Sequence, residues 1–103
     1  MAKKKTDKFA LAKEQASVYR IFSNEKRLLI FWLLTDHEMS VNDLSDAIDS
    51  TVQNTSQHLR LMKAANILDS HRNGQSILYH IADSEIAQYC TEILYPKVQS
   101  SAA

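Results

Sequence analysis

The sequence predicts a mainly α-helical domain that carries a single β-hairpin. Only one glycine and one proline occur among 103 residues, which leaves little turn-forming material for a fold built from many hairpins. Apolar residues recur mostly at helical spacing, and one Asn-Gly pair supplies the strongest two-residue hairpin signal. Hydrophobic residues make up 45% of the chain and charged residues 23%, so an intrinsically disordered chain is not expected.

Two helices are predicted in the first third of the chain. The first, at about 8–22, is indicated by an apolar stripe with three- and four-residue spacing: Phe9, Ala12, Ala16, Tyr19 and Phe22. Ser23 or Asn24 offers an N-cap for a second helix at about 25–35. The second helix contains the run from Leu28 to Leu34 and is apolar nearly all round, so we expect it at the centre of the core.

A third and a fourth helix follow with a tight break between them. Ser40 followed by Asp43 is a helix-start signature, and the short helix that follows has an apolar face of Val41, Leu44 and Ile48. After a break at 49–51, the fourth helix is expected at about 52–65. Its inward positions are predicted to be Val52, Leu59, Met62 and Ala65. A short helix, a tight break and a second helix with a polar outer face form a helix-turn-helix arrangement.

The hairpin and a last helix complete the chain. The Asn-Gly pair at 73–74 is expected to occupy both central turn positions, which would pair Arg72 with Gln75 and Leu68 with Tyr79. Asp83 or Ser84 then caps a helix that is expected to run to Pro96. Its apolar face comprises Ile86, Tyr89, Cys90, Ile93 and Leu94. The predicted order of elements, ααααββα, is that of a winged helix-turn-helix, with the hairpin as the wing.

Composition excludes several functional classes. Twelve Lys and Arg balance twelve Asp and Glu, so a uniformly basic nucleic-acid binder is excluded, whereas a local basic footprint is not. The longest apolar run has seven residues, and a membrane-spanning helix needs roughly 20. A lone cysteine excludes an intramolecular disulfide framework. We therefore expect a cytoplasmic protein without membrane contact, and with no nucleophile-base pair or phosphate loop in the sequence we expect no enzymatic activity.

The polar residues of the fourth helix and the hairpin suit double-stranded DNA. The major groove of DNA admits one helix. From the fourth helix, Asn54 and Gln57 can pair with adenine, and Arg60 can pair with guanine or phosphate. Thr51 and Ser56 can donate to phosphate oxygens near the helix start. The expected DNA-binding residues are Thr51, Gln53, Asn54, Ser56, Gln57, Arg60, Lys63, Arg72 and Gln75. The same residues would also suit a solvated polar face, and a protein-interaction module remains an alternative.

Four stretches of the chain share a recognisable pattern: FSNEKRLLIFWLL, EMSVNDLSDAI, TSQHLRLMKAANIL and RNGQSILYHI. They resemble the ArsR/SmtB family of small winged-helix transcriptional repressors, and the resemblance spans about residues 16–94. The most specific parts are the run Ser56-Gln57-His58-Leu59 in the recognition helix and the Asn-Gly wing followed by Tyr79. The resemblance implies a homodimer built through the first and last helices. It further implies binding to an inverted-repeat operator and release by an inducer.

The positions that bind metal in the metal-sensing branch of this family are replaced here. In the register of its Glu-Leu-Cys-Val-Cys-Asp-Leu box, Ser40 and Asn42 stand where the branch has two thiolates. The last helix contains no histidine, and the four histidines of the chain match no zinc-box spacing. We therefore expect no metal site, no cofactor and an inducer that is not a metal bound at those positions.

Cys90 leaves a thiol-based redox regulator as a further alternative. A free cysteine on the apolar stripe of the last helix more commonly behaves as a small buried hydrophobe, which is the interpretation we favour. The expected organisation is a basic flexible N-terminus at 1–7, a DNA-binding and dimerisation domain at 8–97 and a flexible tail at 98–103.

Overall fold

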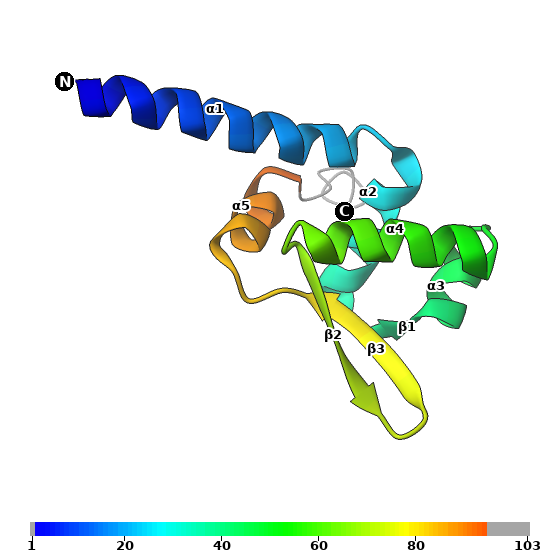
Figure 1. Ribbon diagram of the computed structural model, residues 1–103. Helices are drawn as coiled ribbons and strands as arrows, with labels where there is room; N and C mark the ends of the chain where they lie inside the picture. The colour runs from blue at the N-terminus through cyan, green and yellow to red at the C-terminus, as the bar shows by residue number, and fades with distance from the viewer. Residues whose placement is uncertain (1, 95–103) are drawn as a thin grey trace, which may run out of the picture.

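Within residues 2–94, five helices surround a small antiparallel sheet (Figure 1). The computed structural model describes the backbone of these residues and the side chains of residues 7–94. The elements are α1 (Ala2–Phe22), α2 (Glu25–Asp36), β1 (Met39–Ser40), α3 (Val41–Ala47), α4 (Val52–Ala64), β2 (Leu68–Asn73), β3 (Ser76–Ile81) and α5 (Glu85–Leu94). This order confirms the mainly α fold with a β-hairpin wing and adds one short strand, β1.

The long helix α1 and the wing lie on opposite sides of the molecule. In Figure 1, α1 runs along one edge and the hairpin of β2 and β3 projects from the other. Helix α4 lies between them, and its C-terminal end approaches α5. None of the helices in the described part of the chain combines the length and the apolar character needed to cross a membrane.

Helix α2 lies at the centre of the core, as predicted. Its N-cap is Asn24, whose side-chain oxygen accepts a hydrogen bond from the Arg27 amide at 3.1 Å. Ile30 and Phe31 are fully buried, and the Phe31 ring packs edge-on against Phe22, with ring centroids 5.2 Å apart. The buried cluster around them draws on most elements and comprises Val18, Phe22, Ile30, Phe31, Leu34, Leu44, Ile48, Leu59, Met62, Ile67, Leu68 and Cys90.

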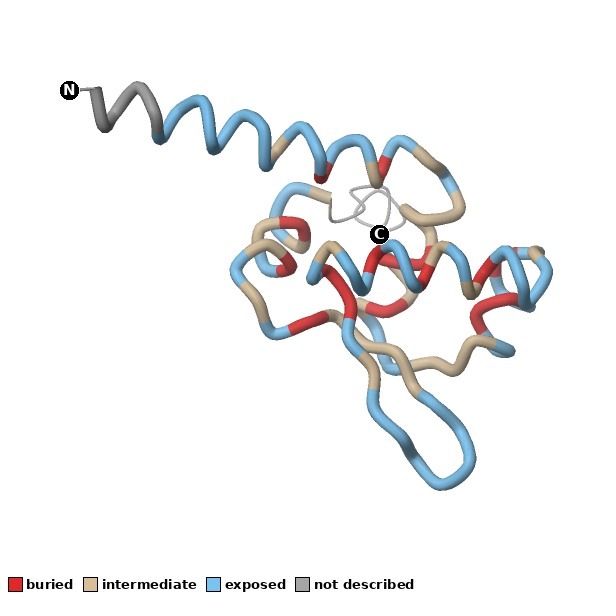
Figure 2. The backbone as a smooth tube through the Cα atoms, viewed as in Figure 1, coloured by how far each residue is buried: buried red, intermediate tan, exposed pale blue. Residues whose placement is uncertain are grey.

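The predicted stripe of α1 is wrong for most of its length. The helix begins at Ala2 rather than at residue 8, and only its last turns pack on the core, through Val18 and Phe22 (Figure 2). Phe9 and Tyr19, which the stripe placed inward, are 66% and 50% exposed. The helical spacing identified the helix correctly. It could not show that most of the helix extends beyond the core of its own chain.

The sheet has the order β1-β3-β2, and its first strand was not predicted. Met39 pairs with Tyr79, so that β1 adds to the free edge of β3. Strands are recognised in a sequence by apolar and polar residues that alternate over several positions. A strand of two residues is too short to show this alternation. β1 therefore depends on the edge that β3 offers rather than on its own sequence.

The hairpin lies where the sequence placed it, but its register is shifted by two residues. Leu68 pairs with Ile81 instead of Tyr79, and Arg72 pairs with Ile77 instead of Gln75. The turn residues are therefore 74–75, and the only positive φ in the turn is that of Gly74, +67°. A positive φ at the first central position is the feature of a type II′ turn, which needs one glycine rather than an Asn-Gly pair. Because the shift is two residues, each side chain keeps the predicted face of the sheet.

Helix α5 begins after Ser84, whose hydroxyl oxygen accepts a hydrogen bond from the Ala87 amide at 3.1 Å. Ala87 and Cys90 are fully buried, whereas Ile93 is 38% exposed. The predicted end of this helix at Pro96 and the predicted tail at 98–103 lie outside the described residues.

Candidate nucleic-acid interface

The turn between α3 and α4 is fixed by backbone hydrogen bonds. Asp49 adopts a positive φ of 56°, and the Ser50 amide donates to the Ser45 carbonyl at 3.0 Å, which is the long bond of a Schellman cap. The ammonium group of Lys26 on α2 donates to the carbonyls of Ile48 and Asp49, at 2.5 and 3.0 Å. Since these carbonyls end α3, the contact holds the helix-turn-helix against α2.

Helix α4 is oriented by a cap and by its buried side. The Thr51 hydroxyl oxygen accepts a hydrogen bond from the Asn54 amide at 3.0 Å, and the buried Thr55 hydroxyl donates to the Thr51 carbonyl at 2.8 Å. Leu59 and Met62 are fully buried, as predicted. Val52 is 45% exposed and not inward, because it occupies the first turn of α4, which extends past the core.

The opposite side of α4 is an exposed polar row. Gln53, Asn54, Gln57 and Arg60 are all exposed, and Ser56 is half-buried. The Thr51 hydroxyl accepts the capping bond with its oxygen, so that its own proton stays available for a phosphate oxygen. The predicted groove-facing residues of this helix therefore share one accessible side.

The wing is joined to the C-terminal end of α4. Asn66 has a positive φ of 66°, and the Ile67 amide donates to the Met62 carbonyl at 3.0 Å, so a Schellman cap turns the chain directly into β2. The Lys63 ammonium group donates to the Ser70 hydroxyl on β2 at 2.8 Å. Lys63, predicted to contact phosphate, is thus also a link between α4 and the wing.

The two wing residues predicted to contact DNA are exposed. Arg72 lies near the end of β2, and Gln75 lies in the turn itself. Figure 1 shows this hairpin extending beyond the body of the molecule. All nine residues predicted to contact DNA therefore lie on α4, at its N-cap or on the adjacent hairpin.

The charges on the helix-turn-helix are divided between its two helices. Arg60 and Lys63 lie on α4, whereas the exposed carboxylates of Asp43, Asp46 and Asp49 lie on α3 and its turn. Within the helix-turn-helix, the basic side chains thus lie on α4 and the acidic ones on α3 and its turn, which agrees with a local basic footprint.

His58 lies on the inner side of α4 and does not belong to the polar row. Its Nδ1 is 3.4 Å from a guanidinium nitrogen of Arg27, and because guanidinium only donates, Nδ1 is the acceptor. Burial, followed by the positive charges of Arg27 and Lys26, lowers the pKa of His58 below 6.5. The ring therefore contributes to the α2–α4 contact in its neutral form.

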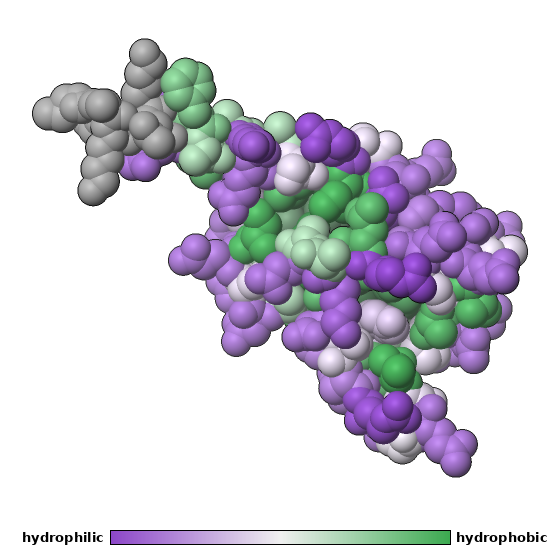
Figure 3. Space-filling model, viewed as in Figure 1, coloured by the Kyte–Doolittle hydropathy of each residue, from purple (hydrophilic) through white to green (hydrophobic). Residues whose placement is uncertain are grey.

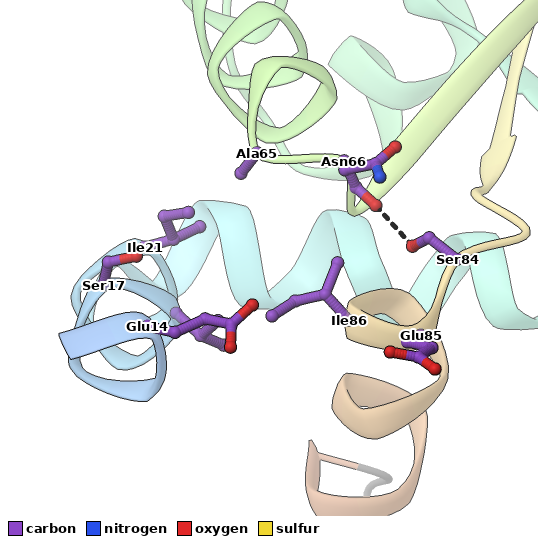
Figure 4. A pocket seen from close by; sticks show the side chains of 9 residues that line it. Glu14, Ser17, Ile21, Ala65, Asn66, Ser84, Glu85 and Ile86 are labelled. Atoms are coloured by element: carbon purple, nitrogen blue, oxygen red, sulfur yellow. Dashed lines mark hydrogen bonds between the residues drawn. The ribbon is translucent and has the colours of Figure 1, made fainter. Parts of the chain in front are cut away.

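Helices α1 and α5 carry a second set of exposed residues, which are apolar and which we call the α1–α5 face. They are Phe9, Leu11, Tyr19 and Ile93. The two helices meet where the Tyr19 and Tyr89 hydroxyls lie 3.3 Å apart. Beside the α1–α5 face, a cavity of about 420 Å³ opens between α1, α5 and the turn that follows α4 (Figure 4). Ile21 and Ile86 line this cavity, and the Ser84 hydroxyl donates to the Asn66 carbonyl at its edge. Figure 3 shows apolar surface between α1 and α4 in this region.

Cys90 is fully buried on α5, and its burial raises the pKa of the thiol to about 11. At neutral pH the side chain is therefore the protonated thiol, whereas the reactive form of cysteine is the thiolate. Both observations favour the structural role over the redox alternative.

The fold and the polar row define a winged helix-turn-helix regulator, and comparison with known proteins gives its family. Residues 22–71 match the family described as a helix-turn-helix domain. The transcriptional regulator YgaV of Escherichia coli is 33% identical over 75% of this chain and 79% of its own length. The chain belongs to the ArsR/SmtB family of winged helix-turn-helix transcriptional regulators.

Solved structures agree with this assignment. The transcriptional repressor BigR of Xylella fastidiosa matches 86% of this chain and 88% of its own, with a TM-score of 0.78 and 26% identity. The homodimeric winged helix-turn-helix domain Mb0332 of Mycobacterium bovis matches 92% of this chain and 83% of its own, with a TM-score of 0.71 and 27% identity. These relatives are DNA-binding regulators, in agreement with the expectation of a regulator rather than an enzyme. The chain spans about 60% of the length of the curated relatives KmtR and CadC.

Proposed function

We propose that the protein is a sequence-specific, cytoplasmic transcriptional repressor that binds an inverted-repeat operator as a homodimer. The exposed polar row of α4, held beside a projecting wing, is the observation that carries this proposal. Repressors occur among its relatives, as the name of BigR states. The row is polar and its charged member is positive, which favours DNA over a protein partner at α4.

In the proposed complex, α4 of each protomer enters the major groove. Gln53, Asn54 and Gln57 contact base edges, while Arg60 contacts guanine or phosphate. Thr51 and Ser56 donate to phosphates at the start of the helix, and Lys63, Arg72 and Gln75 contact the backbone from the wing side. The two recognition helices of a two-fold dimer would meet half-sites about 34 Å apart.

The proposed dimer interface is the α1–α5 face. Its exposed apolar side chains, Phe9, Leu11, Tyr19 and Ile93, have no covering partner among the described residues of one chain. A second copy related by a two-fold axis would present the same face and bury both. The homodimeric state of the Mb0332 domain supports a dimer.

The proposed inducer is not a metal bound at the positions of the metal-sensing branch. The Ser40 hydroxyl oxygen caps α3 by accepting from the Asp43 amide at 3.2 Å, and Asn42 is exposed on the same helix. Neither side chain is a ligand for a soft metal ion.

Selection from a random DNA pool, followed by salt-titrated anisotropy, tests the proposal. We expect an inverted repeat to be enriched, and to be bound more tightly than a scrambled duplex near physiological salt with reductant present. Gln57→Ala should relax the preference at one position by about 1–3 kcal/mol, whereas the exposed Gln88→Ala on α5 should not. Equal, steeply salt-dependent binding to all duplexes, or no binding, would contradict a sequence-specific repressor.

A further inference from the structure

Three side chains with metal-binding chemistry meet at the base of the wing, outside the polar row. Among the described residues, Glu38, His71 and His80 form a group whose ligand atoms all lie within 4.8 Å of one another. Glu38 Oε1 lies 3.5 Å from His71 Nε2, and Glu38 Oε2 lies 4.0 Å from His80 Nδ1. The group is open to solvent on one side, because the three side chains are 33–46% exposed.

The sheet brings these three residues together. His71 on β2 pairs with Leu78, so His80, two residues further along β3, lies diagonally opposite on the same face. The two rings are 5.3 Å apart between centroids. Glu38 immediately precedes β1, whose pairing with β3 at Met39 and Tyr79 brings the carboxylate next to both rings.

The polar atoms in this group lie close together without being hydrogen-bonded to one another, and one separation matches that of two ligands on a metal ion. Both nitrogen-oxygen distances exceed the usual hydrogen-bond range of about 2.7–3.2 Å. Ligands on a tetrahedral zinc ion, at bonds of about 2.0–2.1 Å, are separated by roughly 3.3 Å, close to the shorter distance here. His80 Nδ1 is buried and has no hydrogen-bond partner among the described residues, although buried polar atoms are rarely left unsatisfied.

We propose that Glu38, His71 and His80 form a site for a divalent transition-metal ion of the zinc class, with water as a further ligand. Two imidazoles and one carboxylate suit Zn²⁺, Co²⁺ or Ni²⁺, and three protein ligands leave a coordination position for solvent. The site is distinct from the family positions at Ser40 and Asn42 and from the last helix. It also stands independently of the proposed DNA binding.

The bound ion would cross-link the wing to the segment that leads into the helix-turn-helix. Glu38 belongs to the connection between α2 and β1, whereas both histidines belong to the hairpin. Because the ion binds the folded arrangement of three separate segments, it should raise the stability of the folded state. His71 neighbours Arg72, so the ion also adds positive charge beside a residue proposed to contact DNA.

Metal titration of the untagged full chain tests the site. Zn²⁺ is titrated in competition with a chromophoric chelator, and Co²⁺ is followed by its visible absorption. We expect one ion per chain, a cobalt spectrum of low coordination number and a higher thermal midpoint with Zn²⁺. Glu38→Gln, His71→Gln and His80→Gln should each weaken binding by roughly tenfold or more.

Two control variants separate this site from other ligands. His58→Gln removes a histidine that contacts Arg27 on α2, and Cys90→Ser removes the one thiol of the chain. Both should retain the ion at wild-type affinity. Absence of binding to the wild type, or equal weakening by the three site variants and the two controls, would overturn the proposal. Neither result would bear on the anisotropy experiment, which is performed without added metal.

Discussion

The apolar residues of the helix-turn-helix and those of the α1–α5 face differ in burial. Around α2, α3 and α4, large apolar side chains such as Phe31, Leu44 and Leu59 are fully buried within one chain. On α1, Phe9 and Tyr19 are 66% and 50% exposed although both belong to a stripe with helical spacing. The contrast shows that one part of the protein buries its large apolar side chains within one chain, whereas the other leaves large apolar side chains exposed.

This difference in burial is the reason why we propose DNA binding for one region and dimerisation for the other. A domain whose core is closed can carry exposed polar residues that do not contribute to folding, and these are the residues of the α4 row. An exposed apolar face is instead costly in water unless it is covered, which is the physical reason for placing the proposed dimer interface there.

The largest expected effect comes from opening the closed core. Phe31→Ala removes a fully buried ring that packs against Phe22, and it should lower the free energy of unfolding by about 3–5 kcal/mol in urea titration. Phe31→Leu should lower the free energy of unfolding by less than Phe31→Ala and should remain folded. Phe9→Ala removes the same side chain from an exposed position and should cost less than half as much. Equal losses for the two alanine variants would remove the distinction between the regions.

The next effect tests the α1–α5 face. Leu11→Glu places a charge on an apolar residue that we propose to lie between protomers, and it should weaken association by about 2 kcal/mol, roughly thirtyfold in dissociation constant. Sedimentation velocity over a dilution series measures this change. Ile77→Glu, on the 43% exposed wing residue Ile77, should leave the oligomeric state unchanged. A Leu11→Glu protein that dimerises like the wild type would place the interface elsewhere.

A smaller effect should separate DNA binding from stability in the helix-turn-helix. Arg60→Ala should reduce operator affinity several-fold, about 1 kcal/mol per protomer, and leave the unfolding midpoint unchanged, because the side chain is exposed. Arg20→Ala on α1 removes another exposed arginine and serves as the matched control. The prediction fails if both variants bind the operator as tightly as the wild type.

The smallest effect is a pH dependence inside the closed region. The pKa of His58 is lower in the folded state than its ordinary 6.5, so the unfolded chain takes up its proton first. The stability associated with this group is therefore present above about pH 6.5 and is lost as pH falls through the interval between the two pKa values. His58→Gln should lose less stability than the wild type between about pH 7 and 5.5 in urea titrations. His37→Gln, an exposed histidine, should follow the wild type.

Much of the local structure was predictable because it depends on neighbours in the sequence. Ser40 caps α3 and Thr51 caps α4 through hydrogen bonds to amides three residues ahead, which is a contact that spacing alone specifies. The apolar character of α2 on all sides predicted its central position. The polar row of α4 followed from the same periodicity, since its buried side was recognisable in Leu59 and Met62.

Other features depend on segments that are distant in the chain. Strand β1 forms because β3 offers an edge, and the hairpin register follows the pairing of whole strands rather than the preference of Asn-Gly for a turn. The Glu38, His71 and His80 group was missed because its spacing matches no linear motif. The one available signal was a pair of histidines flanking the hairpin at positions that share a face.

The sequence by itself determined the fold class, the order of the helices, their caps and the polar side of α4, because periodicity and capping act over one or two helical turns. The tertiary structure alone decided which apolar residues are covered, since Phe9 and Val52 occupy helical turns that extend past the core. It also decided which polar residues meet, as in the contact of Lys63 with Ser70. Both outcomes depend on how the elements pack against one another, which local spacing does not specify.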